Sequence, residues 1–244
     1  PVRKIRINRP EKKNALTLAM YESMAAAIED SAMEASVRCL LISGTHDIFC
    51  AGNDLNDFVA MARSGALGVP IVRFLHALAR CEKPLVAAVS GAAVGIGTTM
   101  LLHCDLVYAG DNAAFSLPFV NLGLCAEGGS SVMLPALMGY QKAAEKLLLG
   151  EAFYAEEAQE LGLVNRIVPP LEVAAYAQAQ AAKLALKPLA SLVATKALMK
   201  LPQTQLASVM QEELKHFGSL LKGPAAKEAI SAVMEKRRPD FSNC

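Results

Sequence analysis

The chain has 244 residues with 24 basic and 23 acidic side chains, for a formal net charge of +1. A chain of this length forms one large domain, or one domain with an appendage, and can bury a substantial core. The balanced charge argues against a nucleic-acid partner. Six scattered cysteines without a C-x-x-C pair lack metal-ligand spacing and indicate reduced thiols rather than a disulfide framework.

Strands and helices are predicted to alternate through the first two thirds of the chain. Short apolar runs predict buried strands, and apolar positions at helical spacing predict helices. The predicted strands lie around residues 5–8, 39–43, 85–89, 105–109, 113–116 and 163–168. Three predicted helices begin after Thr17, near Asp54 and at Pro70, and a fourth follows the turn 90–97 and ends near His103. Three more are predicted at 128–138, 141–149 and 155–161.

The pattern changes after Pro169 and Pro170. From residue 171 to residue 244 no strand-like run occurs, and helical periods are interrupted by prolines and Gly223. We therefore predict an α/β core followed by an all-helical region. An apolar helical region of this kind serves as a subunit interface or packs on its own core.

A membrane-spanning segment is the first alternative for the apolar stretch 85–102, which contains 18 residues without a charge. Glycines at 91, 95 and 97 divide this stretch into a strand, a turn and a helix start. We therefore predict no contact with a membrane.

Two glycine-containing turns, at 49–55 and 90–97, are the most informative features of the sequence. Each follows a predicted buried strand and opens a predicted helix, where backbone N–H groups have no intrahelical partner. Two such turns brought together can direct two N–H donors at one oxygen and stabilise an oxyanion. A third segment, 125–129, places the carboxylate of Glu127 between small residues. Two donors and one base suffice for enolate chemistry.

A dinucleotide-binding loop is the alternative for the second turn, whose G-x-x-x-G-x-G pattern looks like the cofactor turn of short-chain dehydrogenases. That turn follows the first strand of its fold, whereas here it begins at residue 91. No tyrosine has a lysine four residues later, and the G-K-[ST] signature is absent. Taken alone, the turn is a structural one.

Taken together, the motifs identify a family. The motifs that carry the likeness follow one another as Arg9-Pro10, Asn14-Ala15-Leu16, the turn 49–55, Lys83-Pro84 before the turn 91–97, Cys104-Asp105, and Pro118 with Gly123. This order resembles the enoyl-CoA hydratase/isomerase (crotonase) superfamily over essentially the whole chain. The resemblance implies an α/β fold in which residues 1–169 form a spiral of β-β-α units with an acyl-CoA site. It also implies that residues 170–244 form a helical trimerisation region, giving a homotrimer or a dimer of trimers.

The same resemblance implies the catalytic groups. The backbones of Ala51 and Ile96 are the expected oxyanion donors, and Glu127 is the expected base. Hydratases of the family use two glutamates at positions where this chain has Thr99 and Phe119, which argues against hydration. The segment 123–131 resembles the peroxisomal type of Δ3,Δ2-enoyl-CoA isomerase. Apolar neighbours such as Phe119 are expected to raise the pKa of Glu127 toward neutrality.

The resemblance also implies contacts with coenzyme A, which arrives as part of the substrate, so no separate cofactor or metal is expected. The expected binding residues are Asn14, Ala15, Leu16, Gly52, Asn53, Asp54, Leu55, Gly95, Phe217 and Lys236. Simpler interpretations stay open: Glu127 as a solvated loop residue, Asp54 as a helix cap and Lys236 as a solvated surface lysine.

The sequence therefore predicts an acyl-CoA enzyme that shifts a 3-double bond to the trans-2 position. The alternatives are other enolate chemistry of the superfamily (hydratase, hydrolase or decarboxylase) and a non-catalytic acyl-CoA-binding module. The alanine-rich composition, with a C-terminus unlike a peroxisomal S-K-L signal, predicts a bacterial cytoplasmic protein.

Overall fold

Two β-sheets form the centre of the structure, a computed structural model that describes residues 1–64, 66–200, 205–242 and 244. The larger sheet is parallel, in the order β1 (Val2–Arg6), β2 (Cys39–Ser43), β4 (Leu85–Val89), β6 (Leu106–Gly110) and β9 (Arg166–Val168). The smaller sheet has the order β3 (Ile48–Cys50), β5 (Ala92–Val94), β7 (Ala114–Ser116) and β8 (Phe153–Tyr154), in which only β8 is antiparallel to its neighbour.

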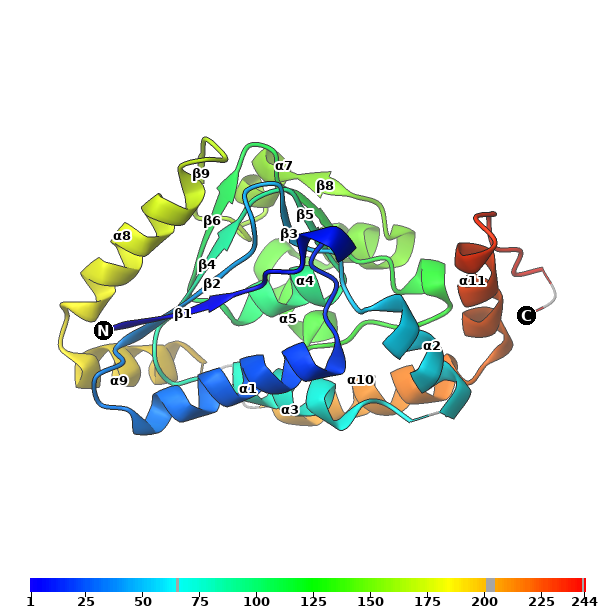
Figure 1. The fold of residues 1–244 in the computed structure, drawn as a ribbon, viewed down its shortest axis with the longest axis horizontal. Coiled ribbons are helices and arrows are strands. Elements are labelled where there is room, and N and C mark those ends of the chain that lie inside the picture. The colour runs from blue at the N-terminus through cyan, green and yellow to red at the C-terminus, as the bar shows by residue number, and fades with distance from the viewer. Residues whose placement is uncertain (65, 201–204, 243) are drawn as a thin grey trace.

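The chain passes from the larger sheet to the smaller one three times in succession, through β2 and β3, β4 and β5, and β6 and β7. Helices follow each pair: α2 (Leu55–Ser64) and α3 (Val69–Ala79), then α4 (Ile96–Thr99), then α5 (Ser130–Met138). This arrangement confirms the predicted spiral of β-β-α units (Figure 1). Because β3, β5 and β7 are parallel neighbours, the segments that leave them emerge at the same edge of the smaller sheet.

The short strands of the smaller sheet are where the sequence prediction was incomplete. The strands β3, β5 and β8 were not predicted, and β5 lies inside the segment 90–97 that was predicted as a turn. Strands of two or three residues are too short to show a period of two. The helix predicted after that turn is shorter, because α4 has 4 residues and continues as the 3-10 helix η2 (Met100–His103). The last strand begins at Arg166 rather than at residue 163.

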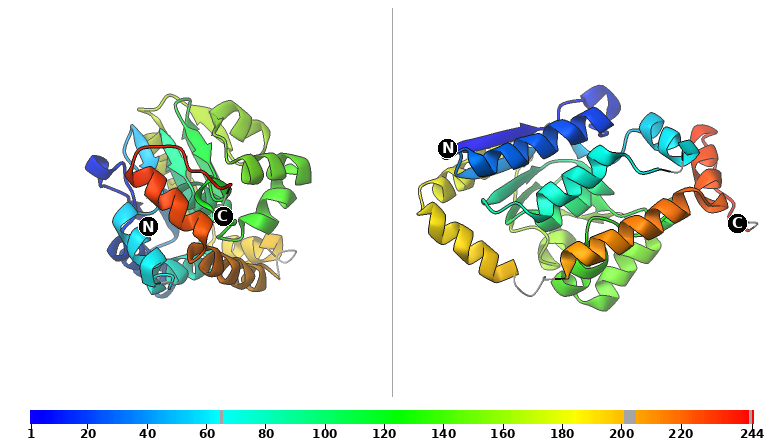
Figure 2. Two further views of the ribbon diagram at one scale, coloured as in Figure 1. Left: turned by 90° about the vertical axis from the view of Figure 1, so that its right-hand side faces the viewer. Right: turned by 90° about the horizontal axis from the view of Figure 1, so that it is seen from below.

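Two helices from the first third of the chain, α1 (Leu18–Met33) and α3, pack against each other below the sheets (Figure 2). The predicted cap of α1 is confirmed, because the Thr17 hydroxyl accepts a hydrogen bond from the Met20 N–H at 3.3 Å. In α3 the predicted Pro70 lies in the first turn, where its missing N–H costs no hydrogen bond. The remaining elements of the core are η1 (Pro10–Lys12), η3 (Val120–Leu122), α6 (Tyr140–Ala144), η4 (Glu145–Leu149) and α7 (Ala155–Glu160).

The central strands of the larger sheet are buried on both faces. On β2, Cys39 and Leu41 face α8 (Val173–Ala185), whereas Leu40 and Ile42 face the main core. Because both faces of these strands are buried, their sequences are continuous apolar runs and do not alternate between apolar and polar residues. The stretch 85–102 is therefore divided among β4, β5, α4 and η2. No single helix among the described residues is long and apolar enough to cross a membrane, although α2 and α3 together pass that test by length and composition.

The C-terminal third is helical in its described residues, as predicted, and comprises α8, α9 (Leu189–Lys200), α10 (Leu206–Leu221) and α11 (Pro224–Met234). Within this chain α10 contacts α3 and α5, and α11 contacts α2 and η3. Figure 1 shows α11 at the end of the molecule opposite α8, with α10 running along the lower side toward it. The C-terminal helices therefore pack on the core of their own chain.

A single buried asparagine joins the loop before α1 to β3. The Nδ2 of Asn14 donates to the carbonyl oxygens of Ile48 at 2.9 Å and Phe49 at 3.2 Å. Its Oδ1 accepts a hydrogen bond from the Arg9 N–H at 2.7 Å. Asn14 is fully buried and adopts a left-handed backbone conformation with φ of 56°. Its main role is therefore to hold this loop in place.

Replacing Asn14 by alanine should lower the free energy of unfolding by about 2–4 kcal/mol, because it leaves buried backbone groups without partners. The exposed Lys12 provides a control, and Lys12→Ala should change the value by less than about 0.5 kcal/mol. Urea unfolding followed by circular dichroism measures both. Equal stability of the two variants would contradict this role of Asn14.

Candidate active site

The two glycine-containing turns lie side by side because they follow the paired strands β3 and β5. In this pairing Ile48 is opposite Ala92 and Cys50 is opposite Ala93. At Gly97 a Cβ atom would lie 2.7 Å from the carbonyl oxygen of Cys50, so only glycine allows this approach. The sequence thus brings the N-termini of α2 and α4 to one place.

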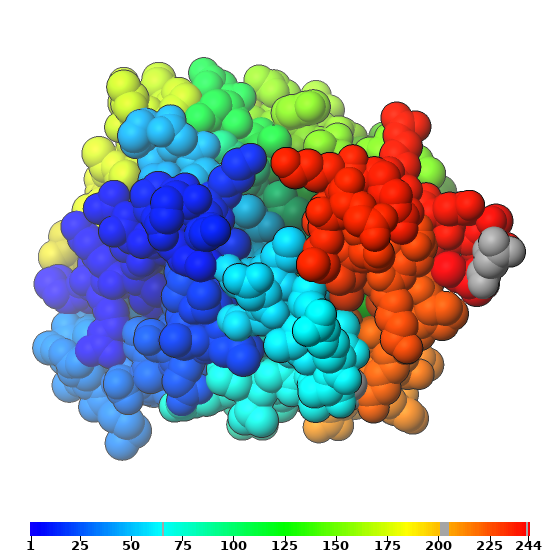
Figure 3. Space-filling view, turned by 45° about the vertical axis from the view of Figure 1, so that its right-hand side comes forward, coloured from blue at the N-terminus to red at the C-terminus, as the bar shows by residue number. Residues whose placement is uncertain are grey.

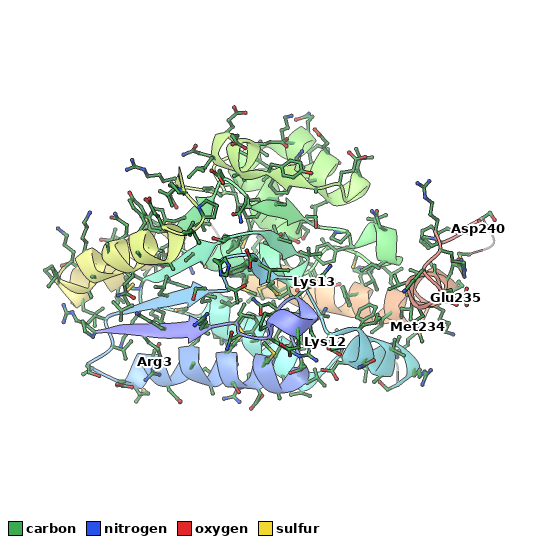
Figure 4. The ribbon with its side chains drawn as sticks, turned by 45° about the horizontal axis from the view of Figure 1, so that its top comes forward. Arg3, Lys12, Lys13, Met234, Glu235 and Asp240 are labelled. Atoms are coloured by element: carbon green, nitrogen blue, oxygen red, sulfur yellow. The ribbon has the colours of Figure 1, made fainter. Side chains whose placement is uncertain are left out.

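The backbone N–H groups of the first turn differ in their availability. The N–H of Ala51, the predicted donor, already donates to the carbonyl oxygen of Lys13 at 3.1 Å. Figure 4 labels Lys13 together with its neighbour Lys12. The N–H of Asn53 has no hydrogen-bond acceptor among the described residues, and Asn53 lines the cavity described below. The N–H of Ala51 is therefore engaged within the chain whereas that of Asn53 is not, and an internal bond of this kind leaves no trace in the residue pattern.

The second turn begins α4 at Ile96, the residue predicted as the other donor. Ile96 is the first residue of α4, so its N–H has no intrahelical acceptor. Within the described residues this N–H makes no hydrogen bond, and Ile96 also lines the cavity. Asn53 and Ile96 therefore each bring to the cavity a backbone N–H without an acceptor among the described residues, one from each turn.

Several contacts hold the first turn rigid. The Arg9 guanidinium donates to the Asp54 carboxylate at 2.6 Å and to the Ala15 carbonyl oxygen at 3.2 Å. This guanidinium holds the pKa of Asp54 below its ordinary value. The other oxygen of Asp54 accepts a hydrogen bond from the Asn56 N–H at 2.9 Å, which confirms Asp54 as a cap of α2. The Tyr21 hydroxyl donates to Oδ1 of Asn53 at 2.6 Å.

An apolar cavity of about 170 Å³ opens beside the two turns. Its wall combines residues far apart in the chain, including Phe58 and Ile71 from α2 and α3 and Phe217 and Ile230 from the C-terminal helices. Figure 3 shows the surface hollowed between the N-terminal segment, α2 and α11. The C-terminal helices therefore complete the site.

Glu127 is the one carboxylate among the described residues that line this cavity. It is only 7% exposed, and Oε1 accepts a hydrogen bond from the Thr99 hydroxyl at 2.6 Å. Burial raises the pKa of Glu127 to about 7, the Thr99 hydrogen bond lowers it, and the charge of Glu213 raises it. The expected rise of this pKa is confirmed, and the solvated-loop alternative for Glu127 is wrong.

The structure places the predicted site residues in three kinds of position. The cavity is lined by Ala51, Gly52, Asn53, Leu55, Gly95, Ile96, Glu127 and Phe217. Asn14, Ala15, Leu16 and Asp54 instead lie behind the first turn and support it through hydrogen bonds. Lys236 is exposed beyond the end of α11, next to Glu235, which Figure 4 labels. A groove beside the cavity carries Arg63, Lys222 and Lys227 instead.

Sequence reasoning missed two residues near Glu127. Tyr21 lines the cavity and comes from the buried face of α1. Glu213 lies on the apolar face of α10, between Met210 and Phe217. A carboxylate at helical spacing within an apolar face is the signal that could have identified Glu213.

A buried carboxylate and two backbone N–H groups without acceptors among the described residues lie at one apolar cavity, and these are the groups that enolate chemistry requires. The family model for enoyl-CoA hydratase/isomerase matches residues 1–243. The chain belongs to the enoyl-CoA hydratase/isomerase family and has its crotonase fold.

Individual relatives carry different activities in their names. The chain is 34% identical over 236 residues to the 2,3-dehydroadipyl-CoA hydratase of Escherichia coli, covering 96% of this chain and 92% of that one. It is 40% identical over 173 residues to enoyl-CoA delta isomerase 2 of the rat, covering 69% of this chain and 44% of that one. The structure of Pseudomonas aeruginosa OdaA superposes with a TM-score of 0.91 at 44% identity, covering 96% of this chain and 95% of that one.

The burial of Glu127 predicts a pH-dependent effect on stability. Its pKa is about 7 in the folded protein against an ordinary value of 4.5, so the folded state loses stability as the carboxyl ionises between these values. Glutamine cannot ionise. From pH 5 to pH 8, Glu127→Gln should therefore gain about 2–3 kcal/mol of unfolding free energy relative to wild type. Urea unfolding at both pH values tests this, and an unchanged difference would contradict it.

Proposed function

We propose that the protein is a Δ3,Δ2-enoyl-CoA isomerase, which converts a 3-enoyl thioester into the trans-2-enoyl thioester. The observation that carries this proposal is the buried carboxylate of Glu127, the one carboxylate among the described lining residues, in a cavity also lined by Asn53 and Ile96, whose N–H groups have no acceptor in the described part of the chain. Moving a double bond by one position requires one proton to leave C2 and one proton to arrive at C4. One base between these carbons can perform both steps.

In the first step, the Glu127 carboxylate takes the proton from C2. The electron pair of the broken C–H bond moves toward the thioester carbonyl, which gives a dienolate with its negative charge on oxygen. The N–H groups of Asn53 and Ile96 hold this oxygen, with Asn53 in place of Ala51 because its N–H is available. One donor of this kind contributes about 3–4 kcal/mol to a transition state.

In the second step, the protonated Glu127 returns a proton to C4. The C3–C4 electron pair of the dienolate forms the new C4–H bond, and the C1–C2 pair shifts to form the C2–C3 double bond. The negative charge on oxygen returns to re-form the thioester carbonyl, and Glu127 is again a carboxylate. A pKa of about 7 suits both steps, because the group accepts and releases a proton near neutral pH. No cofactor other than the coenzyme A of the substrate takes part.

The main alternative is hydration, the activity named for the Escherichia coli relative. Hydration delivers a hydroxyl group to one carbon and a proton to the next, which the family achieves with a second glutamate. Thr99 and Phe119 stand at the two positions of those glutamates, and Thr99 instead donates its hydroxyl hydrogen to Glu127. The name of the rat relative, an enoyl-CoA delta isomerase, agrees with the single-base arrangement.

The remaining parts of the proposal concern binding and assembly. Arg63, Lys222 and Lys227 are suited to the phosphates of coenzyme A, in addition to Lys236. Partly exposed apolar side chains at the end of α11, Val233 and Met234, support a homotrimer or a dimer of trimers, which light scattering measures. A bacterial cytoplasmic location also remains a prediction.

Replacing Glu127 by glutamine keeps the shape of the site and removes its base. With 3-enoyl-CoA as substrate, Glu127→Gln should lower kcat by about 10²–10⁴-fold and leave KM nearly unchanged. The control is Glu151→Gln, an exposed position, which should retain wild-type activity. Wild-type protein should also isomerise 3-enoyl-CoA much faster than it hydrates 2-enoyl-CoA.

The alternatives give different results in the same assays. Full isomerase activity of Glu127→Gln would contradict the single-base mechanism. Faster hydration than isomerisation would favour the hydratase. Acyl-CoA binding without turnover in either protein would favour a binding module.

A further inference from the structure

A second buried glutamate, Glu213, lies behind the loop that carries Glu127. It belongs to α10 and is only 6% exposed. Its Oε2 accepts a hydrogen bond from the Gly129 N–H at 2.6 Å, and its Oε1 accepts one from the Ser131 N–H at 3.0 Å. The Ser131 hydroxyl also donates to Oε1. One carboxylate thus binds both ends of a three-residue segment.

This segment is the start of α5 and begins two residues after Glu127. The N–H groups in the first turn of a helix have no intrahelical acceptors, and the dipole there favours a negative charge. Gly129 has a left-handed backbone with φ of 79°, as does Gly128 with φ of 68°. Glycines allow many conformations, so a flexible turn of this kind needs outside contacts to adopt only one.

The other polar groups of the turn are also held in place. The Glu127 carbonyl oxygen accepts a hydrogen bond from the Ser130 hydroxyl at 2.7 Å. The Gly128 carbonyl oxygen lies 2.7 Å from Nε2 of His103. Burial lowers the pKa of His103 to about 4, so the ring is neutral and donates from Nε2. Among the described side chains that form these hydrogen bonds with residues 127–131, only Glu213 is charged and only Glu213 comes from a C-terminal helix.

We propose that Glu213 is a positioning residue, which fixes the turn at Gly128 and Gly129 so that the Glu127 carboxylate reaches C2 and C4 of the substrate. This inference rests on the proposed role of Glu127 as the base. It also means that the C-terminal helices set the geometry of the base, in addition to forming part of the cavity wall.

The charge of Glu213 gives this proposal a measurable signature. The groups that face Glu127 are Tyr21 from α1, Thr99 from α4, Cys125 from the same loop, and Glu213 from α10. Among them only Glu213 is a second carboxylate, and its charge raises the pKa of Glu127. Since the base works when ionised, kcat falls on the acidic side of this pKa. Removing the charge of Glu213 should therefore move the acidic limb of the kcat profile to lower pH.

Three variants on α10 test the proposal. Glu213→Gln removes the charge and leaves one of the two N–H groups without an acceptor. Glu213→Asp keeps the charge but shortens the side chain. Glu212→Gln is the matched control, because Glu212 is the exposed neighbour on the same helix. Each is assayed with 3-enoyl-CoA from pH 5 to pH 9, beside Glu127→Gln, with thermal unfolding as the check on folding.

The expected result is a loss of about 10²-fold in kcat for Glu213→Gln, with KM nearly unchanged and the acidic limb at lower pH. Glu213→Asp should have a lower kcat with the acidic limb of its kcat profile at the wild-type pH. Glu212→Gln should match wild type in both. Wild-type kcat in Glu213→Gln would overturn the proposal. So would a loss of kcat with a raised KM and an unmoved limb, which indicates general disruption.

If Glu213→Gln does not fold, Glu213→Asp decides the question. A reduced kcat at unchanged KM supports the positioning role, and wild-type kcat overturns it. Failure of the proposed function is recognised separately, because Glu127→Gln then keeps its isomerase activity whatever the Glu213 variants do.

Discussion

The burial of one carboxylate is the constraint on which the rest of the site depends. Glu127 is desolvated enough to have a pKa of about 7, and a single hydroxyl, from Thr99, provides its side-chain hydrogen bond. In water the same group would be a weaker base and would exchange its proton freely. The apolar cavity, the short helix α4 and the C-terminal helices together exclude water from this carboxylate.

The site joins parts of the chain that are far apart in sequence, and each has a separate physical task. The paired strands β3 and β5 bring two helix N-termini together, and Gly97 permits the close approach. Arg9 and Asn14 hold the first turn from behind. The helix α10 closes the cavity with Phe217 and contacts the base-carrying loop through Glu213. Rigid support of this kind holds the proposed donors and base in a fixed arrangement.

Much of this could be predicted from the sequence, because glycine turns after apolar strands have a clear local meaning. The strands β2 and β4, the cap at Thr17 and the raised pKa of Glu127 were predicted correctly. The short strands β3, β5 and β8 could not be predicted, since a few residues carry no periodicity. The hydrogen bond from Ala51 to Lys13 and the contact of Glu213 with Gly129 join distant segments, so only the folded chain shows them.

The transfer of a labelled proton tests the single-base account most directly. A 3-enoyl-CoA substrate carrying deuterium at C2 is converted in ordinary water under single-turnover conditions, and the product is analysed at C4. Because Glu127 is buried, the account predicts that part of the deuterium removed from C2 appears at C4. A product with only protium at C4 would contradict return of the proton by the same carboxylate.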